Sequence, residues 1–278
     1  MKINVVFEGG GIKGIAYIGV LKFLEERGIQ IFQVGGTSVG AILASLIAVG
    51  YSAAELSALI ENFDFSMLKY FGKSGRMRGI IDSVKGIGIY SLQDFENYMQ
   101  TLAEAKNKTT FLDVKHGEDY LLKMIATEWV TKKKVIIPDD LKYFNINPDT
   151  FLISKAAAMS ASIPIFYRYY PIDKYRFLDG GIVSNFPIDL FAGSDLLTLG
   201  FRVNEKFVDR YRTVKMYRRR VFKLDKEIDY GNYEIINIDT FKIGAVDYRK
   251  GLANKERLIS SGYNSIKKYF YEKMVNFQ

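Results

Sequence analysis

Two strand–turn–helix units open the chain one after the other, and each turn is built from glycines. Residues 3–7 form an apolar run interrupted only by Asn4, as expected for a strand that is buried on both faces. A glycine-rich turn leads into residues 12–27, which carry a helical apolar stripe and end at Gly28. Residues 29–34 predict a second strand, and residues 39–49 are apolar on all sides, as in a central buried helix. This alternation predicts a parallel α/β sheet.

The rest of the chain continues without an internal repeat, a low-complexity stretch or a flexible linker. Further strands are predicted at residues 120–127, 134–137, 168–172, 175–178, 196–199 and 235–238, and helices after an N-cap at Ser91 and at residues 254–270. We therefore expect one domain over residues 1–278. It comprises a core of about residues 2–200, a basic insertion of about 201–226, and a closing strand and helix of about 227–278.

Composition narrows the class of protein further. Hydrophobic residues make up 48% of the 278 residues and charged residues 25%, which is typical of a globular protein. The chain has no cysteine, so disulfides and cysteine-ligated zinc are excluded. The first residues read as a strand and not as a signal peptide, and the longest uncharged helical stretch, residues 40–50, is too short to cross a bilayer. We expect a cytoplasmic protein, with peripheral contact to a membrane as one reading.

Positive charge is concentrated between Arg202 and Lys226. This segment holds ten Lys or Arg against three Asp or Glu, a net charge of +7, with aromatic side chains interleaved. A patch that faces an anionic membrane is one interpretation, because each cation near such a surface contributes about 1 kcal/mol. Nucleic acid is a second interpretation, although no nucleic-acid-binding motif accompanies the charge and we expect no such partner. A solvated basic helix is the third. The oligomeric state is left open.

The first glycine turn, Gly9-Gly10-Gly11-Ile12-Lys13-Gly14, matches the dinucleotide-binding fingerprint in its strand-to-helix context. A dinucleotide site also requires an acidic residue at the end of the second strand, and that strand ends in Val34-Gly35-Gly36. A P-loop is excluded because Gly14 is followed by Ile15-Ala16. Backbone N–H groups at such a helix start still face a negative centre, and an oxyanion would suit them as well as a phosphate.

The second glycine turn, Gly36-Thr37-Ser38-Val39-Gly40, fits the Gly-x-Ser-x-Gly nucleophile elbow between a strand and a helix. A nucleophilic Ser38 needs a base. The chain has a single histidine, His116, which lies in a polar turn sequence where a solvated role is the simpler interpretation. The alternative is a carboxylate, and Asp179 directly follows a predicted strand, although Asp179-Gly180-Gly181 alone is also an ordinary turn sequence.

Taken together, these motifs resemble the patatin-like phospholipase family. Its members carry a Gly-Gly-Gly-x-Lys/Arg-Gly loop, a Gly-x-Ser-x-Gly elbow and an Asp-Gly-Gly/Ala motif, in the order found here. The stretches 156–166 and 179–187 also resemble the family, except that Ser184-Asn185-Phe186-Pro187 stands where many members have Asn-Asn-Pro. The resemblance covers about residues 2–200 and the closing helix. It implies a three-layer α/β/α sandwich with a mostly parallel central sheet.

The resemblance further implies a Ser–Asp dyad, with Ser38 as the nucleophile and Asp179 as its base. The N–H groups of Gly9, Gly10 and Gly11 would form an oxyanion hole. Supporting roles fall to Lys13, Gly14, Gly36, Gly40, Gly180 and Gly181. The expected reaction is hydrolysis of a carboxylic ester of a (phospho)lipid at a membrane surface, through an acyl-serine and without a metal or cofactor.

Two other classes of function stay open at this point. One is a lipid- or membrane-binding protein that keeps the fold without turnover, which the intact Ser38 and Asp179 argue against. The other is a nucleotide-binding protein that uses the first glycine turn, which lacks the acidic residue for the ribose.

Overall fold

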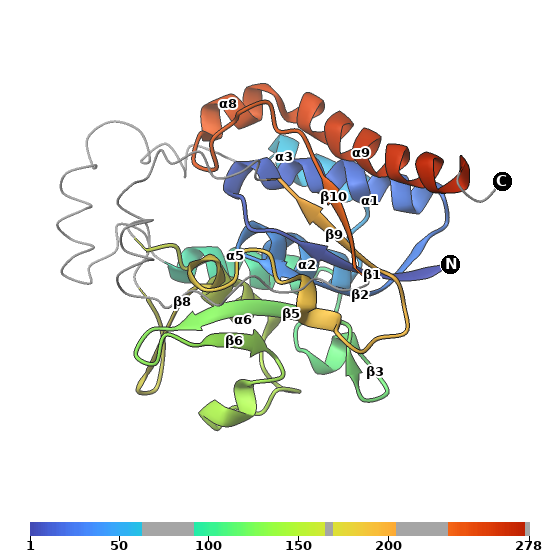
Figure 1. Cartoon of the computed structure of the whole chain (residues 1–278). Coiled ribbons are helices and arrows are strands. Elements are labelled where there is room, and N and C mark those ends of the chain that lie inside the picture. Colours follow the sequence, from blue (N-terminus) through green and yellow to red (C-terminus); the bar gives the residue numbers. More distant parts are fainter. Residues whose placement is uncertain (63–91, 165–168, 204–232, 276–278) are drawn as a thin grey trace.

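A central mixed sheet organises the chain in the computed structural model, which describes residues 1–62, 92–164, 169–203 and 233–275 (Figure 1). Within these residues the strand order is β10-β9-β1-β2-β5-β8-β7, and β6 pairs with β5. The strands from β10 to β5 pair in parallel, whereas β6 and β8 run antiparallel to β5. The sheet consists of β1 (Lys2–Phe7), β2 (Gln30–Thr37), β5 (Leu122–Glu128), β6 (Lys134–Ile137), β7 (Tyr170–Ile172), β8 (Tyr175–Asp179), β9 (Thr198–Arg202) and β10 (Glu234–Asn237), and β3 (Lys115–His116) pairs separately with β4 (Asp119–Tyr120).

Helices connect these strands. They are α1 (Ala16–Glu26), α2 (Val39–Val49), α3 (Ala53–Asn62), α5 (Leu92–Glu104), α6 (Ile153–Ser160), α8 (Tyr248–Ala253) and α9 (Lys255–Val275), with short 3-10 helices at Gly11–Ile15, Leu112–Val114, Leu141–Phe144, Gly180–Ile182 and Ile188–Phe191. The first predicted helix is confirmed, but its opening turn is a 3-10 helix. Gly28 ends it in the left-handed conformation, with φ of 62°. The predicted N-cap Ser91 lies outside the described residues.

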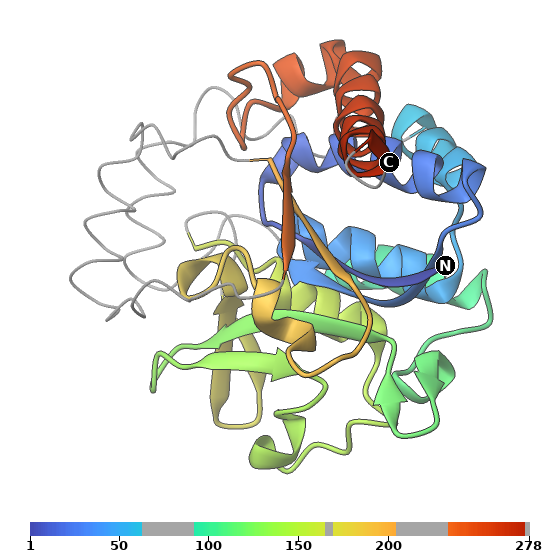
Figure 2. The same ribbon diagram turned by 45° about the vertical axis from the view of Figure 1, so that its right-hand side comes forward.

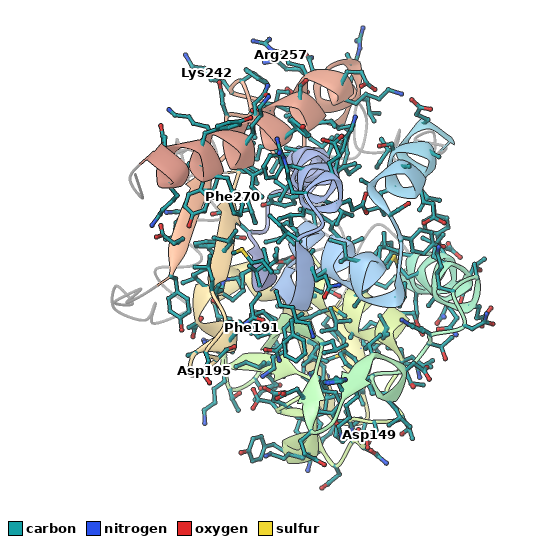
Figure 3. The ribbon with its side chains drawn as sticks, turned by 90° about the vertical axis from the view of Figure 1, so that its right-hand side faces the viewer. Asp149, Phe191, Asp195, Lys242, Arg257 and Phe270 are labelled. Atoms are coloured by element: carbon teal, nitrogen blue, oxygen red, sulfur yellow. The ribbon has the colours of Figure 1, made fainter. Side chains whose placement is uncertain are left out.

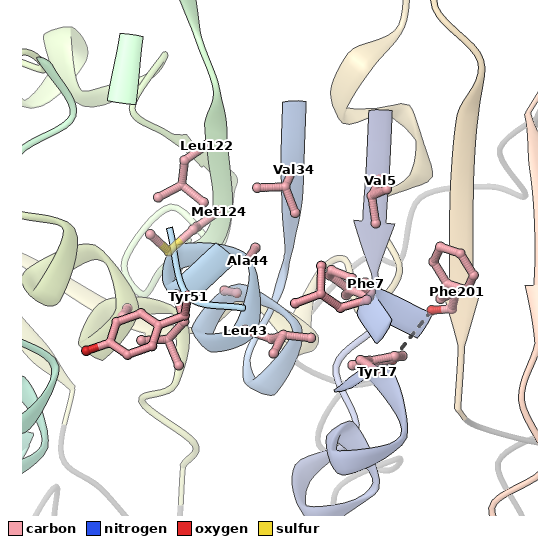
Figure 4. Close-up of a cluster of buried hydrophobic side chains, with 14 of the residues drawn as sticks. Val5, Phe7, Tyr17, Val34, Leu43, Ala44, Tyr51, Leu122, Met124 and Phe201 are labelled. Carbon is pink, nitrogen blue, oxygen red and sulfur yellow. Dashed lines mark hydrogen bonds between the residues drawn. The ribbon is translucent and has the colours of Figure 1, made fainter. Parts of the chain in front are cut away.

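The two faces of the sheet bury different cores, because successive side chains of a strand point to opposite sides. Val5 and Phe7 of β1 point into the larger core, where they meet Leu43 and Ala44 of α2 (Figure 4). The side chain of Val6 points to the other face, where the 3-10 helix Ile188–Phe191 covers it. The larger core also holds side chains of α1, α5, α6 and α9.

Two glycines allow α1 and α9 to pack in close contact on the same side of the sheet (Figures 1 and 2). A Cβ on Gly19 would lie 1.8 Å from the carbonyl oxygen of Ile259, and one on Gly262 would lie 1.8 Å from that of Ala16. Below α9, Phe270 turns its ring toward the interior (Figure 3), where it stacks on Phe23 at a centroid distance of 5.6 Å. The closing helix is thus joined to the first helix of the chain.

The predicted α/β sandwich with a mostly parallel central sheet is confirmed. The second strand runs further than expected: it continues through Gly35 and Gly36 to Thr37. It can do so because bare glycines let β2 approach its neighbours, since a Cβ on Gly35 would lie 2.7 Å from the Lys123 carbonyl oxygen. The basic segment lies outside the described residues from residue 204 to residue 226. None of the described helices is both long and apolar enough to span a membrane.

Candidate active site

Ser38 occupies the sharp turn between β2 and α2. Its backbone has φ of 55° and ψ of −123°, a conformation that L-residues rarely adopt and that costs on the order of 1–3 kcal/mol. The turn is held because the Ser38 N–H donates a hydrogen bond of 3.0 Å to Oγ of Ser160, at the end of α6. Ser38 is 6% exposed. The predicted elbow is therefore present, and a hydrogen bond to a helix far along the chain holds its strained backbone in place.

The glycines of the elbow allow β1 to pass very close beneath it. A Cβ on Gly36 would lie 2.7 Å from the carbonyl oxygen of Phe7, and one on Gly40 would lie 2.4 Å from the same atom. The end of β1, which leads into the first glycine turn, therefore lies directly against the turn that carries Ser38.

The register of β5 explains how Asp179 reaches Ser38. Along one edge of β5, β2 pairs up to Thr37 opposite Ile125. On the same edge, β8 approaches from the opposite direction and ends with Asp179 opposite Ala126, because β6 occupies the other edge. The carboxyl ends of β2 and β8 thus meet at adjacent residues of one strand. Ser38 follows one of these ends and Asp179 forms the other.

The Asp179 carboxyl group is buried, and only one of its two oxygens accepts a well-formed hydrogen bond. Oδ1 accepts a hydrogen bond of 2.6 Å from the Gly181 N–H, whereas Oδ2 is buried without a well-formed hydrogen bond to any described group. Burial raises the pKa of Asp179 to about 6, against smaller lowering effects of the nearby Ser38 hydroxyl and the Gly181 N–H. Asp179 is therefore a stronger base than an exposed aspartate and is still mostly ionised at neutral pH.

The backbone of Asp179 is also fixed from several sides. Its N–H donates to the Ser162 carbonyl oxygen at 2.9 Å, and its own carbonyl oxygen accepts from the Thr127 hydroxyl at 2.9 Å. Gly180 lies against β5, since a Cβ there would be 2.2 Å from the Ile125 carbonyl oxygen. The segment after α6 therefore holds Asp179, just as Ser160 at its end holds Ser38.

The first glycine turn lies beside the elbow. A Cβ on Gly14 would lie 2.5 Å from Cγ2 of Val39, the residue after Ser38, and one on Gly9 would lie 3.2 Å from the Thr37 carbonyl oxygen. Lys13 is buried at 6% exposure in the same turn, and its Cε lies 3.6 Å from where a Cβ of Gly10 would be. All of the glycines predicted to support the site thus lie in close contact with its backbone or side chains, where a Cβ would not fit.

Asn185 links the two glycine-rich loops, a role that no local pattern in the sequence predicted. The Gly9 N–H donates to the Asn185 carbonyl oxygen at 2.9 Å, and the Asn185 side-chain amide donates to the Gly9 carbonyl oxygen at 3.0 Å. The Asn185 Oδ1 also lies 2.8 Å from where a Cβ of Gly181 would be. In this structure the Gly9 N–H is therefore engaged in anchoring the loop.

A buried carboxylate, Glu8, supports the same loop from below. It is 3% exposed, and its Oε2 accepts a hydrogen bond of 2.9 Å from the Val203 N–H. Its Oε1 lies 3.9 Å from Nε of Arg202 and accepts from the Asn185 amide at 3.4 Å. Glu8 thus connects the ends of β1 and β9 to Asn185.

His116 lies at the other end of the sheet. It belongs to β3, where its ring contacts Phe32 edge-on at a centroid distance of 5.9 Å. Phe32 stands near the start of β2 and Ser38 follows the end of that strand, six residues and roughly 20 Å further on. The structure does not bring His116 to Ser38. It also places His116 in a short strand, with the turn that we expected there formed by the residues after it.

A serine on a strained strand-to-helix turn at the carboxyl end of a parallel sheet is the arrangement that serine hydrolases of the α/β class use. The comparisons with known proteins identify the family. The family model described as patatin-like phospholipase matches residues 5–192, and the chain belongs to that family.

The chain is similar in sequence to two relatives and in fold to one solved structure. The chain is 37% identical over 199 residues to the uncharacterized protein YqhO of Bacillus subtilis, covering 69% of this chain and 67% of that protein. It is 30% identical to the cUMP-AMP-activated phospholipase of Escherichia coli, covering 69% of this chain and 58% of that protein. The fold resembles ExoU in its complex with SpcU from Pseudomonas aeruginosa, with a TM-score of 0.54, 17% identity and coverage of 96% of this chain and 51% of that one. The match thus spans about two thirds or less of these proteins.

Proposed function

We propose that the chain is a lipid acyl hydrolase that cleaves carboxylic esters of (phospho)lipids, with Ser38 as the nucleophile and Asp179 as its base. The observation that carries this proposal is that β2 and β8 meet end to end along β5. Ser38 follows one of these strand ends, and Asp179, whose buried Oδ2 accepts no well-formed hydrogen bond, forms the other. The family and its lipid-hydrolase relatives support the substrate class.

The reaction follows from these positions. The Ser38 Oγ attacks the carbonyl carbon of the ester while its proton passes to Oδ2 of Asp179. The tetrahedral intermediate collapses, the alcohol leaves with the proton from Asp179, and an acyl-serine remains. Water then gives a proton to Asp179 and attacks the acyl-serine to form a second tetrahedral intermediate. When this intermediate collapses, Asp179 returns the proton to the Ser38 Oγ and the fatty acid leaves. A carboxylate can act here because its burial raises its pKa to about 6 and so brings it closer to neutral pH.

The oxyanion of the intermediate needs hydrogen-bond donors beside Ser38. The start of the 3-10 helix Gly11–Ile15 lies next to the elbow, and its first backbone N–H groups have no carbonyl partner within the helix. Because the Gly9 N–H donates to Asn185, we assign the oxyanion contacts to Gly10 and Gly11, with Gly9 as the anchor of the loop. Donors that the loop holds ready need no reorganisation when the charge develops, which is the property that makes such holes effective.

The alternative function is a lipid-binding protein without turnover on the same fold. A hydrolysis assay separates the two. Wild type and Ser38→Ala would be incubated with a short-chain soluble ester and with a panel of phospholipids, lysophospholipids and neutral glycerides, and the products identified by mass spectrometry. We expect wild type to release fatty acid and Ser38→Ala to release none, with equal thermal stability. Absence of turnover by wild type on every ester would favour the lipid-binding protein.

A further inference from the structure

Two hairpin turns extend beyond the active site at the same end of the sheet. The turn between β5 and β6 lies on the left in Figure 1, the side toward which β5 runs. The turn between β7 and β8 lies beside it, because β8 pairs with β5 and the Trp129 N–H donates to the Arg176 carbonyl oxygen at 2.8 Å. We call residues 129–133 and 173–176 the tip surface.

The tip surface begins close to the dyad. Asp179 pairs with Ala126, and Trp129 is three residues further along the same strand direction. At the rise of a β-strand, this places the start of the turn about 10 Å beyond Asp179. A bilayer that covers the tip surface therefore lies about 10 Å from Asp179.

The tip surface combines an exposed apolar residue with exposed cations. Val130 is 68% exposed at the end of the hairpin, next to the half-buried Trp129, the only tryptophan of the chain. The two hairpins also carry four exposed cations, Lys132, Lys133, Lys174 and Arg176, against a single exposed acid, Asp173. An exposed apolar residue on hairpins rich in cations suits the interface of an anionic bilayer, where the apolar residue enters the acyl boundary and the cations meet the headgroups.

The turn is preformed for such a contact. The Glu128 carboxylate is 2% exposed and accepts hydrogen bonds from the N–H groups of Val130 at 3.1 Å and of Thr131 at 2.6 Å. Because the backbone is already fixed, Val130 can be inserted without a further ordering cost.

We propose that the tip surface docks the protein onto anionic lipid bilayers and so brings the mouth of the active site to its substrate. This inference rests on the proposed function, since a lipid hydrolase meets its substrate at a bilayer. It differs from the expectation for residues 202–226, because it assigns the contact to two hairpins of the described part of the chain. Nucleic acid fits less well, because its phosphates offer nothing to an exposed valine.

The test measures binding apart from catalysis. Full-length Ser38→Ala protein would be sedimented with vesicles of phosphatidylcholine, with and without phosphatidylglycerol. In this background, Lys132→Gln with Lys133→Gln should weaken binding to the anionic vesicles by about 25-fold, at about fivefold for each lysine. Val130→Asp should weaken binding by about tenfold or more, because it removes the apolar group that would be buried in the bilayer.

Matched controls lie elsewhere on the described surface. Leu112→Asp changes another exposed apolar residue, 56% exposed, and Lys22→Gln with Lys268→Gln removes the same charge from α1 and α9. Binding should be little changed in both. Three results would overturn the docking proposal. Tip and control variants could lose binding equally, the tip variants could bind vesicles like the parent protein, or they could lose binding to a DNA oligomer and not to vesicles.

The soluble-ester assay keeps the two proposals apart. Val130→Asp in the wild-type background should hydrolyse the short-chain ester normally, because that substrate needs no interface. If wild type hydrolyses no ester while binding depends on the tip surface, the proposed function fails and docking stands. If the ester is cleaved and the tip variants bind vesicles like wild type, docking fails and the proposed function stands.

Discussion

At the scale of single residues, the account depends on one buried carboxyl group. One oxygen of Asp179 accepts a hydrogen bond from the Gly181 N–H. The other oxygen accepts no well-formed hydrogen bond from a described residue, and the carboxyl group lies near the Ser38 hydroxyl. Its pKa of about 6 is caused mainly by burial. In the proposed mechanism the ionised form is the one that accepts the Ser38 proton, and it is also the form that burial destabilises.

We expect activity to follow the ionisation of Asp179. The kcat/KM for a soluble ester should be level above pH 7 and fall below pH 6 by about tenfold for each pH unit, because protonated Asp179 cannot accept the Ser38 proton. An ordinary histidine titrates in the same range, so the control is His116→Ala, which should keep the same profile. A profile that changes in His116→Ala would contradict the assignment of Asp179 as base.

The same pKa predicts a change in stability. The folded state binds the Asp179 proton more tightly than the unfolded chain, so ionisation of Asp179 at neutral pH destabilises the fold. Asp179→Asn should therefore raise the free energy of unfolding at pH 7 by roughly 2–3 kcal/mol while it abolishes turnover. The gain should shrink as the pH falls through 6 and vanish near pH 4, as measured by denaturant unfolding. A lower free energy of unfolding for Asp179→Asn than for wild type at pH 7 would contradict a destabilising effect of the buried charge.

The first glycine turn gives a third prediction at this scale. Gly10→Val would place a Cβ 2.5 Å from Cγ2 of Val203 and displace the N–H groups from the oxyanion. Turnover of a soluble ester should fall roughly 10²-fold or more, whereas Lys13→Met should cost less. Gly244→Ala is the matched control, since its Cβ would meet only Cβ of Asp247 at an ordinary 3.6 Å. Full activity of Gly10→Val would assign this loop to another ligand.

At the scale of elements, close backbone contacts position the site. Glycines bring β1 under the elbow, the first glycine turn against α2, and α9 against α1. These contacts leave no room for a side chain. The end of the sheet that carries Ser38 is thus held by close contacts of the backbone as well as by side-chain packing.

Gly262→Ala tests the contact between α9 and α1. Its Cβ would lie 1.8 Å from the Ala16 carbonyl oxygen, so the helices have to move apart. Overpacking of this kind costs about 1–3 kcal/mol, which should appear as a lower unfolding midpoint in denaturant. Gly244→Ala again serves as the control and should unfold like wild type. If both variants unfold like wild type, the helices are not held at this distance.

The sequence predicts elements that local patterns define and leaves open those that long-range pairing defines. The apolar runs and glycine turns around Ser38 are local signals, and they placed the elbow correctly. The approach of Asp179 depends on which edge of β5 each strand occupies, which no local pattern encodes, so only the family resemblance paired it with Ser38. The support by Ser160 and Asn185 spans 122 and 176 residues of sequence and was found only in the structure.

At the scale of the whole molecule, distant parts of the chain share one core. The larger core runs from Ile3 to Ile266, and the sheet joins β1 near one end of the chain to β10 near the other. The charge of +8 is carried in part by the tip surface and in part by residues 202–226. For that segment the expectation stands that Arg218→Gln, Arg219→Gln and Arg220→Gln together weaken binding to anionic vesicles without affecting a soluble ester.

We propose that the chain unfolds as a single domain. Fluorescence of Trp129, beside the active-site end, and far-UV circular dichroism, which reports all helices, should follow the same denaturant transition. The physical reason is the shared core, which cannot lose α9 without exposing α1. Two separated transitions would show that the closing strand and helix form an independent unit.

The most direct test of the central claim is covalent labelling of Ser38. A fluorophosphonate probe reacts with a serine only where a base and an oxyanion hole activate it. Intact-mass and peptide analysis of the wild-type protein should show one adduct, located on Ser38. Labelling should be absent in Ser38→Ala, strongly slowed in Asp179→Asn and unchanged in His116→Ala. An unlabelled wild type, or equally fast labelling of Ser38 in Asp179→Asn, would contradict a Ser38–Asp179 dyad.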